Sequence, residues 1–493
     1  MPKDYLLNLI VKYRYEALSF VFTFLVAATV FLLSDMRFPN DDQFITYRYI
    51  DNLIYGKELV FNFGERVMGF TSPLFTLVGS LFKFLFKWVY TPTIISWLNI
   101  FLLSFSSTFF FRICRRFLSL QFSALAVLIF AFNLSRTIPE GMETPLFLLA
   151  AFIFLDSLFG GRYYTSSIFL SLAILTRPDA GLIAILALVF WWQKAGFQKM
   201  VKLVTVCVAV ALPWFVFSTL YYGSLIPQSL MAKTHTADIV NQSGYQAFKV
   251  QLSDISRTYW GKIFDPDNIP LQVSINLIPV FVLAYVGIKK KITKDNWIIF
   301  AIPIFYLVAF GISNPVMWPW YLSQVLPFWI LASVMGAAYF LSGRGRAIKA
   351  VAFMLLLAGP IYWWLGRSLS NEVGSKEPLF KIGQYLKGKV AEGETIGINN
   401  LGIVGYTTGA NIYDFFGLMN YTSTAFYPVS ECGDESVQYQ IPSTLIMHAR
   451  PDWLVLSGPT EITPCFRESS WFKRNYVAHH GLYGAEIFKL VKQ

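Results

Sequence analysis

Long apolar runs follow one another over the first three quarters of the chain. A membrane-spanning helix needs about 20 mostly apolar residues, and somewhat fewer where flanking side chains reach the interface. Runs of this kind occur at about residues 16–34, 92–112, 119–134, 143–158, 163–176, 180–193, 201–221, 272–288, 296–311, 319–342 and 348–366. After residue 368 the apolar pattern ends. The pattern predicts an α-helical multi-pass membrane domain over 1–368 and a separate polar domain over 369–493.

A further apolar run, at 72–88, decides the topology because Lys83 and Lys87 interrupt it. If this run lies flat in the interface as an amphipathic helix, the clusters of basic residues between the spans all fall on one side. The clusters are Arg112, Arg115 and Arg116; Arg162; Lys194, Lys199 and Lys202; Lys289, Lys290, Lys291 and Lys294; and Arg344, Arg346 and Lys349. Cytoplasmic loops are enriched in Lys and Arg. We therefore predict eleven spans, a cytoplasmic N-terminus, interfacial helices in the first outer loop (35–91), a second outer loop (222–271) and an extracytoplasmic C-terminal domain.

The C-terminal segment alternates short strand-like and helical runs. Strand-like runs occur at 395–399, 411–415, 453–456, 476–479 and 485–490, and helical runs at 401–408 and 443–448. Such alternation predicts a small α/β domain. Gly402, Gly405 and Gly409 do not have the spacing of a dinucleotide-binding loop, so we expect this domain to be non-catalytic.

Composition supports a membrane protein and excludes other classes. The chain is 55% hydrophobic and 14% charged, whereas a soluble domain carries about 25% charged residues. The net charge of +11 lies in short clusters between apolar runs, so it is explained by membrane topology and predicts no nucleic-acid partner. Cys114 and Cys207 lie in or beside apolar runs. Cys432 and Cys465 lie in the polar segment and could pair in an oxidising compartment.

The predicted topology gathers polar motifs on the non-cytoplasmic side. Asp41 and Asp42 follow the first span; the other motifs contain Glu143, then Arg177 and Asp179, then Lys233 and His235, and then Trp318, Trp320 and Tyr321. Ionisable groups at helix ends of a membrane protein indicate a functional site. Zinc-type Cys/His spacing and a cytoplasmic phosphate loop are both missing from the sequence, which argues against an ATP-driven pump and a synthase that uses cytoplasmic nucleotide sugars.

Each motif also has a structural interpretation. Adjacent Asp41 and Asp42 suit a general base held near working pH, or a divalent metal ion, but Asp41 could equally cap the helix over 42–55 with Asp42 solvated in its first turn. Arg177 and Asp179 could close a short loop as an ion pair. Lys233 and His235 could be solvated. The aromatic residues near 320 fit an interfacial belt as well as a sugar-stacking wall.

The first outer loop resembles a known family. The resemblance rests on Asp41-Asp42, Ile45, Arg48-Tyr49, Asn52-Leu53, Gly56, Val60-Phe61-Asn62, Gly64-Glu65-Arg66-Val67, Gly69 and Thr71-Ser72-Pro73. It extends to 141–145, to 176–181, to Tyr222-Gly223, Pro227 and Ala232-Lys233, and more weakly to Gly402–Tyr406, Asp414 and Gly417-Leu418. These residues resemble GT-C glycosyltransferases, and most closely the branch of terminal arabinofuranosyltransferases. The sugar itself stays open.

The resemblance implies a multi-pass enzyme of the cytoplasmic membrane that takes a sugar from a polyprenyl-phosphate donor. The acceptor would be an envelope glycan, lipid or protein at the outer face, with Asp41 or Asp42 as general base. We expect Arg177, Lys233 or Arg48 to bind the donor phosphate. Substrate contacts are expected from Glu143, Asp179, His235, Trp320, Tyr321, Glu65 and Arg66. The resemblance implies no certain cofactor, and a divalent metal ion could bind at the Asp41-Asp42 pair.

Three alternatives stay open at the level of sequence. A transporter or lipid-sugar flippase would also have many spans, although such proteins show repeated halves and charges at the bilayer midplane, and no internal repeat is found here. A protein O-glycosyltransferase would share the donor class and the side of the membrane. A non-enzymatic envelope scaffold would make the polar motifs accidental.

Overall fold

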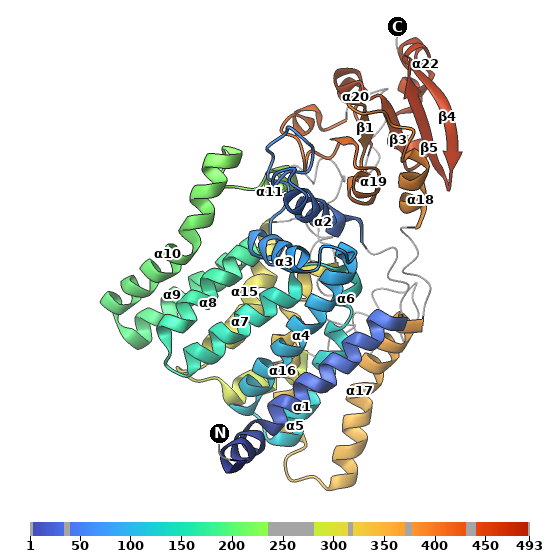
Figure 1. Cartoon of the computed structure of the whole chain (residues 1–493). Coiled ribbons are helices and arrows are strands. Elements are labelled where there is room, and N and C mark those ends of the chain that lie inside the picture. Colours follow the sequence, from blue (N-terminus) through green and yellow to red (C-terminus); the bar gives the residue numbers. More distant parts are fainter. Residues whose placement is uncertain are drawn as a thin grey trace.

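A bundle of helices forms the body of the protein, and a smaller α/β part lies at one end of it (Figure 1). The structure is a computed structural model and describes residues 3–33, 40–234, 281–313, 319–369, 377–429 and 440–491. The bundle helices are α1 (Lys3–Leu33), α4 (Thr91–Arg115), α5 (Leu120–Leu134), α7 (Thr144–Phe159), α8 (Tyr163–Thr176), α9 (Gly181–Ala195), α10 (Phe197–Tyr222), α15 (Trp297–Ser313), α16 (Leu326–Phe340) and α17 (Arg346–Leu369). Residues 281–291 are also helical.

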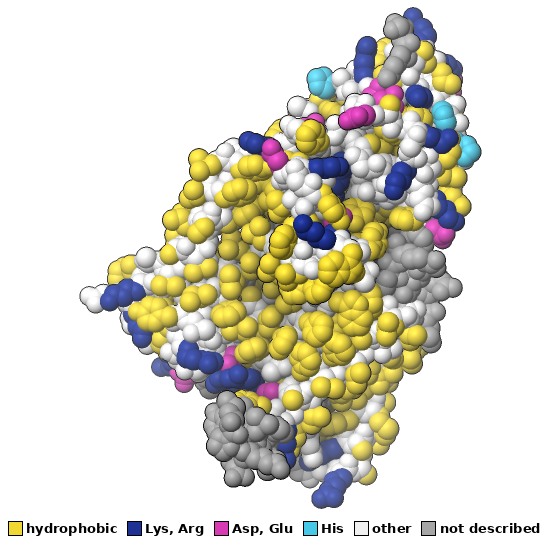
Figure 2. Space-filling model, viewed as in Figure 1, with side chains coloured by type: hydrophobic (Ala, Val, Ile, Leu, Met, Phe, Trp, Pro, Cys, Tyr) yellow, Lys and Arg dark blue, Asp and Glu magenta, His cyan; other side chains and the backbone are white. Residues whose placement is uncertain are grey.

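Several of these helices are suited to a bilayer. Within the described residues, four helical stretches are long and apolar enough to cross it: Tyr13–Leu33, Thr91–Arg115, Leu120–Glu140 and Phe197–Tyr222. Figure 2 shows apolar side chains covering the bundle, whereas charged side chains gather at its lower end and over the α/β part. The chain is a multi-pass membrane protein, and the number of eleven spans stays a prediction.

Aromatic packing and small polar residues hold the bundle together. Phe110 packs against both Phe130 and Phe152, with ring centroids 5.0 and 5.4 Å away, and these two rings also contact each other at 6.2 Å. Small residues let helix backbones approach closely in a membrane, and their hydroxyls bond across the interface. The Ser107 hydroxyl accordingly donates to the carbonyl oxygen of Ser19 at 3.0 Å, which joins α4 to α1.

At the end of the bundle away from the α/β part, three arginines surround one buried carboxylate. Asp156, at the end of α7, is 1% exposed. It accepts from Arg112 at 2.9 Å, Arg116 at 3.2 Å and Arg162 at 2.8 Å. Basic residues from two of the predicted cytoplasmic loops therefore meet at one carboxylate.

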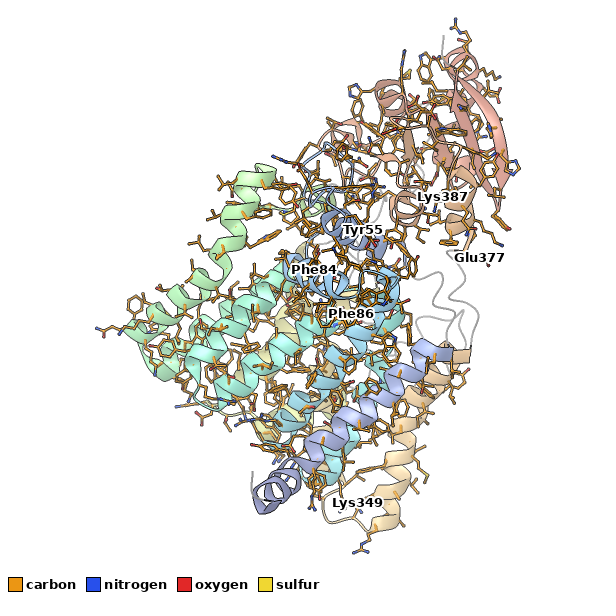
Figure 3. All side chains as sticks on the ribbon, in the orientation of Figure 1. Tyr55, Phe84, Phe86, Lys349, Glu377 and Lys387 are labelled. Carbon is orange, nitrogen blue, oxygen red and sulfur yellow. The ribbon has the colours of Figure 1, made fainter. Side chains whose placement is uncertain are left out.

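Three short helices lie between the bundle and the α/β part: α2 (Asp41–Ile54), α3 (Pro73–Leu85) and α11 (Gln228–Thr234). The 13 residues of α3 span about 20 Å, which is less than the ~30 Å hydrocarbon core of a bilayer. One face of α3 buries Thr76, Ser80 and Lys83, whereas Leu81 and Phe84 on the other face are more than half exposed. Figure 3 shows Phe84 and Phe86 at this junction, close to Tyr55.

The α/β part contains one mixed sheet with the strand order β2-β1-β3-β5-β4. Its strands are β1 (Thr395–Ile398), β2 (Asn411–Asp414), β3 (Trp453–Leu456), β4 (Tyr476–Leu482) and β5 (Ala485–Leu490). Strand β1 runs parallel to β2 and β3, and β5 runs antiparallel to β3 and β4. The helices are α18 (Glu377–Leu386), α19 (Leu401–Thr408), α20 (Ser443–Ala449), α21 (Pro464–Glu468) and α22 (Ser470–Asn475).

The cysteines differ in chemical state. Cys465 in α21 is disulfide-bonded, and Cys432 lies outside the described residues. Cys114 and Cys207 are free thiols.

Candidate active site

A cavity of roughly 160 Å³ opens where the bundle meets α2 and α11. It is built from segments that are far apart in sequence. Its walls are Asp42, Thr71, Met142, Glu143, Arg177, Pro178, Asp179, Leu230, Lys233, Phe310 and Tyr321. The first turn of α2, the start of α7, the loop after α8, α11 and the ends of α15 and of η2 (Pro319–Leu322) thus share one chamber. Three carboxylates and two cations line it.

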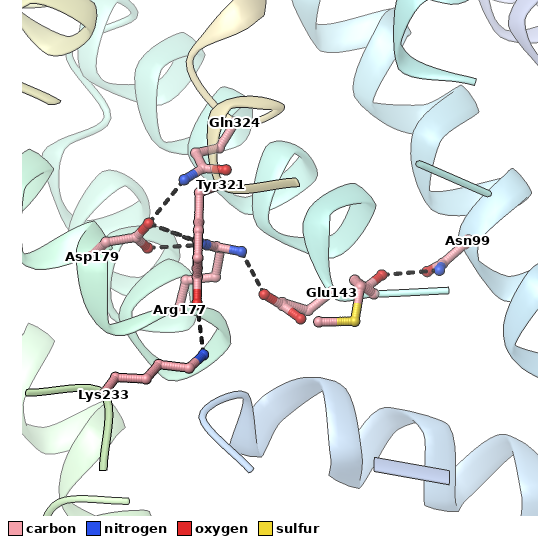
Figure 4. Close-up of polar contacts among 8 residues, drawn as sticks. Asn99, Glu143, Arg177, Asp179, Lys233, Tyr321 and Gln324 are labelled. Atoms are coloured by element: carbon pink, nitrogen blue, oxygen red, sulfur yellow. Dashed lines mark hydrogen bonds and ion pairs between the residues drawn. The ribbon is translucent and has the colours of Figure 1, made fainter. Parts of the chain in front are cut away.

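Arg177 is the centre of a buried polar network (Figure 4). It follows α8 and is 5% exposed. Its Nη1 donates to Glu143 Oε1 at 2.6 Å, and its Nε and Nη2 both donate to the carboxylate of Asp179 at 3.0 Å. Burial disfavours the charged guanidinium, but the two carboxylates outweigh it and raise the pKa of Arg177 above its ordinary value. The charge of Arg177 is therefore already balanced by two acids.

Two residues that sequence reasoning missed hold Asp179 in place. Gln324 Nε2 donates to Asp179 Oδ2 at 2.9 Å, and the Tyr306 hydroxyl donates to the Asp179 carbonyl oxygen at 2.8 Å. Gln324 was detectable as an amide side chain inside the apolar run 319–342. Tyr306 offered no such signal, because tyrosine is common in apolar runs near an interface.

Lys233 provides the second positive charge of the cavity. Its Nζ donates to the Tyr321 hydroxyl at 2.6 Å, and the Tyr321 ring also lies 5.6 Å from the guanidinium carbon of Arg177. Burial opposes the charge on Lys233, but Tyr321, Asp42 and Glu143 together raise its pKa. Lys233 therefore stays charged, and it shares the cavity wall with the carboxylates of Asp42 and Glu143.

The two adjacent aspartates have different surroundings. Asp42 lines the cavity. Asp41 is 5% exposed, and its carboxylate accepts from the backbone N–H groups of Gly402 at 3.0 Å and Ile403 at 2.8 Å. The alternative in which Asp41 caps its own helix is wrong, because Asn40 holds the N-cap position of α2 and Asp41 binds the first turn of α19 instead. Both oxygens of the Asp41 carboxylate are thus engaged by backbone N–H groups of α19.

Arg48 was expected among the phosphate ligands but lies away from the cavity. Its Nη1 donates to the carbonyl oxygen of Gly405 at 2.7 Å and its Nη2 to that of Ala410 at 2.8 Å. The guanidinium also stacks on Phe61, 4.3 Å from the ring centroid. Arg48 therefore binds the C-terminal end of α19 and is not among the residues that line this cavity.

Glu65 and Arg66 are likewise not part of the cavity wall. Glu65 accepts from the Asn62 amide at 2.9 Å, and Arg66 forms an exposed ion pair with Glu58 at 3.1 Å. His235 and Trp318 lie outside the described residues, and for Trp320 only the backbone, in η2, is described. Within the described part of the chain, no group of three His, Cys, Asp or Glu side chains is arranged to hold a metal ion.

Comparison with solved structures identifies the fold. ArnT from Cupriavidus metallidurans bound to undecaprenyl phosphate is similar over 96% of this chain and 98% of its own, with a TM-score of 0.59 and 13% identity. The archaeal oligosaccharyltransferase AglB from Archaeoglobus fulgidus, in complex with an inhibitory peptide and a dolichol-phosphate, has a TM-score of 0.58 and 10% identity, covering 90% of this chain and 69% of that one. The chain shares its fold with these solved structures, which belong to the GT-C superfamily. The arabinofuranosyltransferase branch within the GT-C fold stays a prediction.

Comparisons of the sequence say less about this chain than the comparison with solved structures does. No curated protein matches the sequence. A family model described as "Domain of unknown function (DUF8728)" matches residues 367–488, which contain the sheet except for the last two residues of β5.

Proposed function

We propose that this protein is a glycosyltransferase that moves a sugar from a polyprenyl-phosphate donor to an envelope glycan, lipid or protein at the outer face of the cytoplasmic membrane. The observation that carries the proposal is a cavity, lined by both Asp42 and Lys233, at the end of a fold shared with GT-C enzymes. The solved structures with this fold include one bound to undecaprenyl phosphate and one to a dolichol-phosphate. A lipid-linked phosphate is therefore the donor chemistry that we infer for this chain.

In the proposed reaction Asp42 is the general base. It takes the proton of an acceptor hydroxyl while the hydroxyl oxygen bonds to the anomeric carbon of the donor sugar. The bond between the anomeric carbon and the phosphate oxygen breaks, and polyprenyl phosphate leaves with the electron pair. The residues involved belong to the protein itself, and the step requires no nucleotide.

Lys233 is the proposed ligand of the leaving phosphate. A fixed cation stabilises negative charge that develops in a site shielded from water. Lys233 fits this role better than Arg177, because two carboxylates already balance the charge of Arg177. Arg177 instead holds Glu143 and Asp179 on the cavity wall, where carboxylates accept hydrogen bonds from sugar hydroxyls.

The proposed orientation places the cavity outside. α3 is too short to span and exposes its apolar face, as expected of a helix that lies in the outer interface. The arginines around Asp156 lie at the opposite end, where the positive-inside bias requires the cytoplasm. The disulfide at Cys465 fits an oxidising compartment for the C-terminal domain.

A transfer assay tests the proposal. The full chain, purified in detergent or nanodiscs, is given a panel of synthetic polyprenyl-phosphate sugars with membrane-extract acceptors, and mass spectrometry follows the glycosylated product and the released polyprenyl phosphate. Asp42→Asn should lose roughly 10²- to 10⁴-fold in rate, the range of general acid–base catalysis. Asp295→Asn, a matched change at an exposed aspartate, should retain full rate.

Two results would count against the proposal in different ways. A folded wild-type protein that consumes no donor of the panel would overturn the function. Transfer at the normal rate by Asp42→Asn would overturn the base while leaving the reaction in place.

A further inference from the structure

Helices α2 and α19 lie side by side, although hundreds of residues separate them in sequence (Figure 1). The carboxylate of Asp41 binds the N–H groups at the start of α19, and the guanidinium of Arg48 binds carbonyl oxygens at its end. Asp41 and Arg48 lie seven positions apart in α2. This corresponds to about 10 Å along the helix axis, which is close to the length of α19. A negative group thus meets the N-terminus of α19 and a positive group its C-terminus, as the helix dipole favours.

Two glycines make this close approach of the helices possible. A Cβ atom at Gly402 would lie 2.0 Å from the Asp41 carbonyl oxygen, and one at Gly405 would lie 2.8 Å from Arg48 Nη1. Neither glycine has a positive φ, so each is required for space and not for backbone conformation. This explains the glycine pair that did not fit a nucleotide-binding loop.

A second contact joins the C-terminal domain to the other side of the cavity. Gln228, which begins α11, donates from Nε2 to the carbonyl oxygens of Gly417 at 3.0 Å and Asn420 at 2.9 Å. Gln228 is 6% exposed. Lys233 lies on the same short helix. Both elements that bring charge to the cavity from outside the bundle, α2 and α11, are therefore fastened to the C-terminal domain.

We propose that the C-terminal domain is part of the transferase site and that Asp41 is the positioning residue through which it acts on Asp42. This role rests on the proposed function. Successive side chains of a helix point about 100° apart, so a first turn that is fixed through Asp41 also fixes the direction of Asp42. Asn40 makes no side-chain cap bond to α2, so the bonds from Asp41 to α19 contribute to holding this turn. Displacement of a catalytic group by about 1 Å can reduce a rate roughly 100-fold.

The proposal is tested with two variants that loosen the contact differently. Asp41→Asn removes the charge and one of the two acceptor oxygens, whereas Gly402→Ala leaves both aspartates intact and pushes α19 away from α2. Asp295→Asn and Gly481→Ala are the matched controls, because Asp295 is exposed and a Cβ at Gly481 meets nothing within 4 Å. The full chain is assayed in nanodiscs for kcat over a range of pH, and amide hydrogen exchange is measured at residues 402 and 403.

We expect Asp41→Asn and Gly402→Ala to lower kcat roughly 10- to 100-fold and to accelerate exchange at residues 402 and 403. In Gly402→Ala, which keeps both carboxylates, the acidic limb of the pH profile should move to higher pH, because Asp42 loses its fixed position near the positive charge of Lys233. A partly unfolded sample would instead scale the whole profile down without moving it. Both controls should behave as wild type.

Three outcomes decide between the proposals. Faster exchange at residues 402 and 403 with an unchanged pH profile and kcat in both variants would overturn the positioning role. Lower kcat with an unmoved limb in Gly402→Ala would reduce the contact between α2 and α19 to a folding contact and overturn the positioning role as well. If wild type transfers no sugar at all, the proposed function fails. This result differs from a failure of the positioning role, because it is seen in the wild-type protein and does not depend on the variants.

Discussion

Arg177 and Glu143 form a buried ion pair, with 2.6 Å between Nη1 and Oε1 and side chains that are 6% and 8% exposed. The pair joins the end of α8 to the start of α7 on the cavity wall. Asp179 binds the same guanidinium, so one cation serves two acids. Because all three side chains lie in or beside the cavity, the network affects both stability and substrate binding.

Removal of the central cation should destabilise the protein strongly. Arg177→Gln leaves Glu143 and Asp179 close together without their counter-charge, and breaking a buried pair in this way costs about 3–5 kcal/mol. We expect a clear fall in the thermal unfolding midpoint of the detergent-solubilised chain, followed by tryptophan fluorescence. The triple variant Arg177→Met, Glu143→Gln, Asp179→Asn removes the stranded charges as well and should recover part of the loss.

The control for this prediction is the exposed Arg66–Glu58 pair. Arg66→Gln should change the midpoint little, because solvent screens exposed pairs. An equal effect at Arg66 and Arg177, or no recovery in the triple variant, would show that the buried network does not contribute as described.

Loss of the Lys233 charge should weaken donor binding. Lys233→Gln removes a charge-assisted hydrogen bond to phosphate, worth about 1.5–3 kcal/mol, which corresponds to roughly 10- to 100-fold in kcat/KM for the donor. Tyr321→Phe removes only the hydroxyl that orients Nζ and should have a smaller effect. Donor titrations of the purified enzyme measure both, with Lys194→Gln at the opposite end of the bundle as control. An unchanged kcat/KM for the donor in Lys233→Gln would reassign the phosphate to another cation.

The sequence located the cavity wall but not the roles within it. Successive spans cross the membrane in alternate directions, so every second connection between spans lies on the same side. This argument identified five residues of the wall: Glu143, Arg177, Asp179, Lys233 and Tyr321. That inference needs only the order of apolar runs and the distribution of basic residues. Likewise, each strand of the sheet overlaps a run from which a strand was predicted.

Contacts over long sequence separations could not be predicted in the same way. Asp41 and Asp42 are identical in chemistry and adjacent in sequence, and only the amides of Gly402 and Ile403, more than 360 residues away, distinguish them. Arg48 looked like a phosphate ligand for the same reason: its partners Gly405 and Ala410 belong to the other domain. A single sequence carries no signal for such pairs.

The proposed orientation predicts opposite labelling at the two ends of the molecule. A cysteine introduced at the exposed Glu392 of the C-terminal domain should react with a membrane-impermeant maleimide on intact cells. A cysteine at the exposed Arg346, which begins α17, should react only after the membrane is permeabilised. Mass spectrometry of the purified chain, compared with wild type, reports each site. The reverse pattern would place the cavity in the cytoplasm and remove the basis of the proposed donor chemistry.

The stability of the C-terminal domain should depend on pH through Asp414. Burial raises the pKa of Asp414 to about 7, although the backbone N–H groups of Met419 and Phe416 favour its carboxylate. In an unfolded chain the pKa of aspartate is about 3.9. Between these values the folded domain keeps a proton that the unfolded chain has lost, so stability falls as the pH rises from about 4 to about 7 and then levels off.

Substitution of Asp414 isolates its contribution to the pH dependence of stability. Asp414→Asn cannot titrate, so the decline between pH 4 and pH 7 should flatten, whereas Glu392→Gln at an exposed position should leave it in place. Thermal unfolding of the full chain across this range, with limited proteolysis to report on the C-terminal domain, measures the slope. Because Asp414 begins the loop whose carbonyl oxygens accept from Gln228, the same slope should appear in hydrogen exchange of that loop. A decline that persists unchanged in Asp414→Asn would assign the titration to a different group.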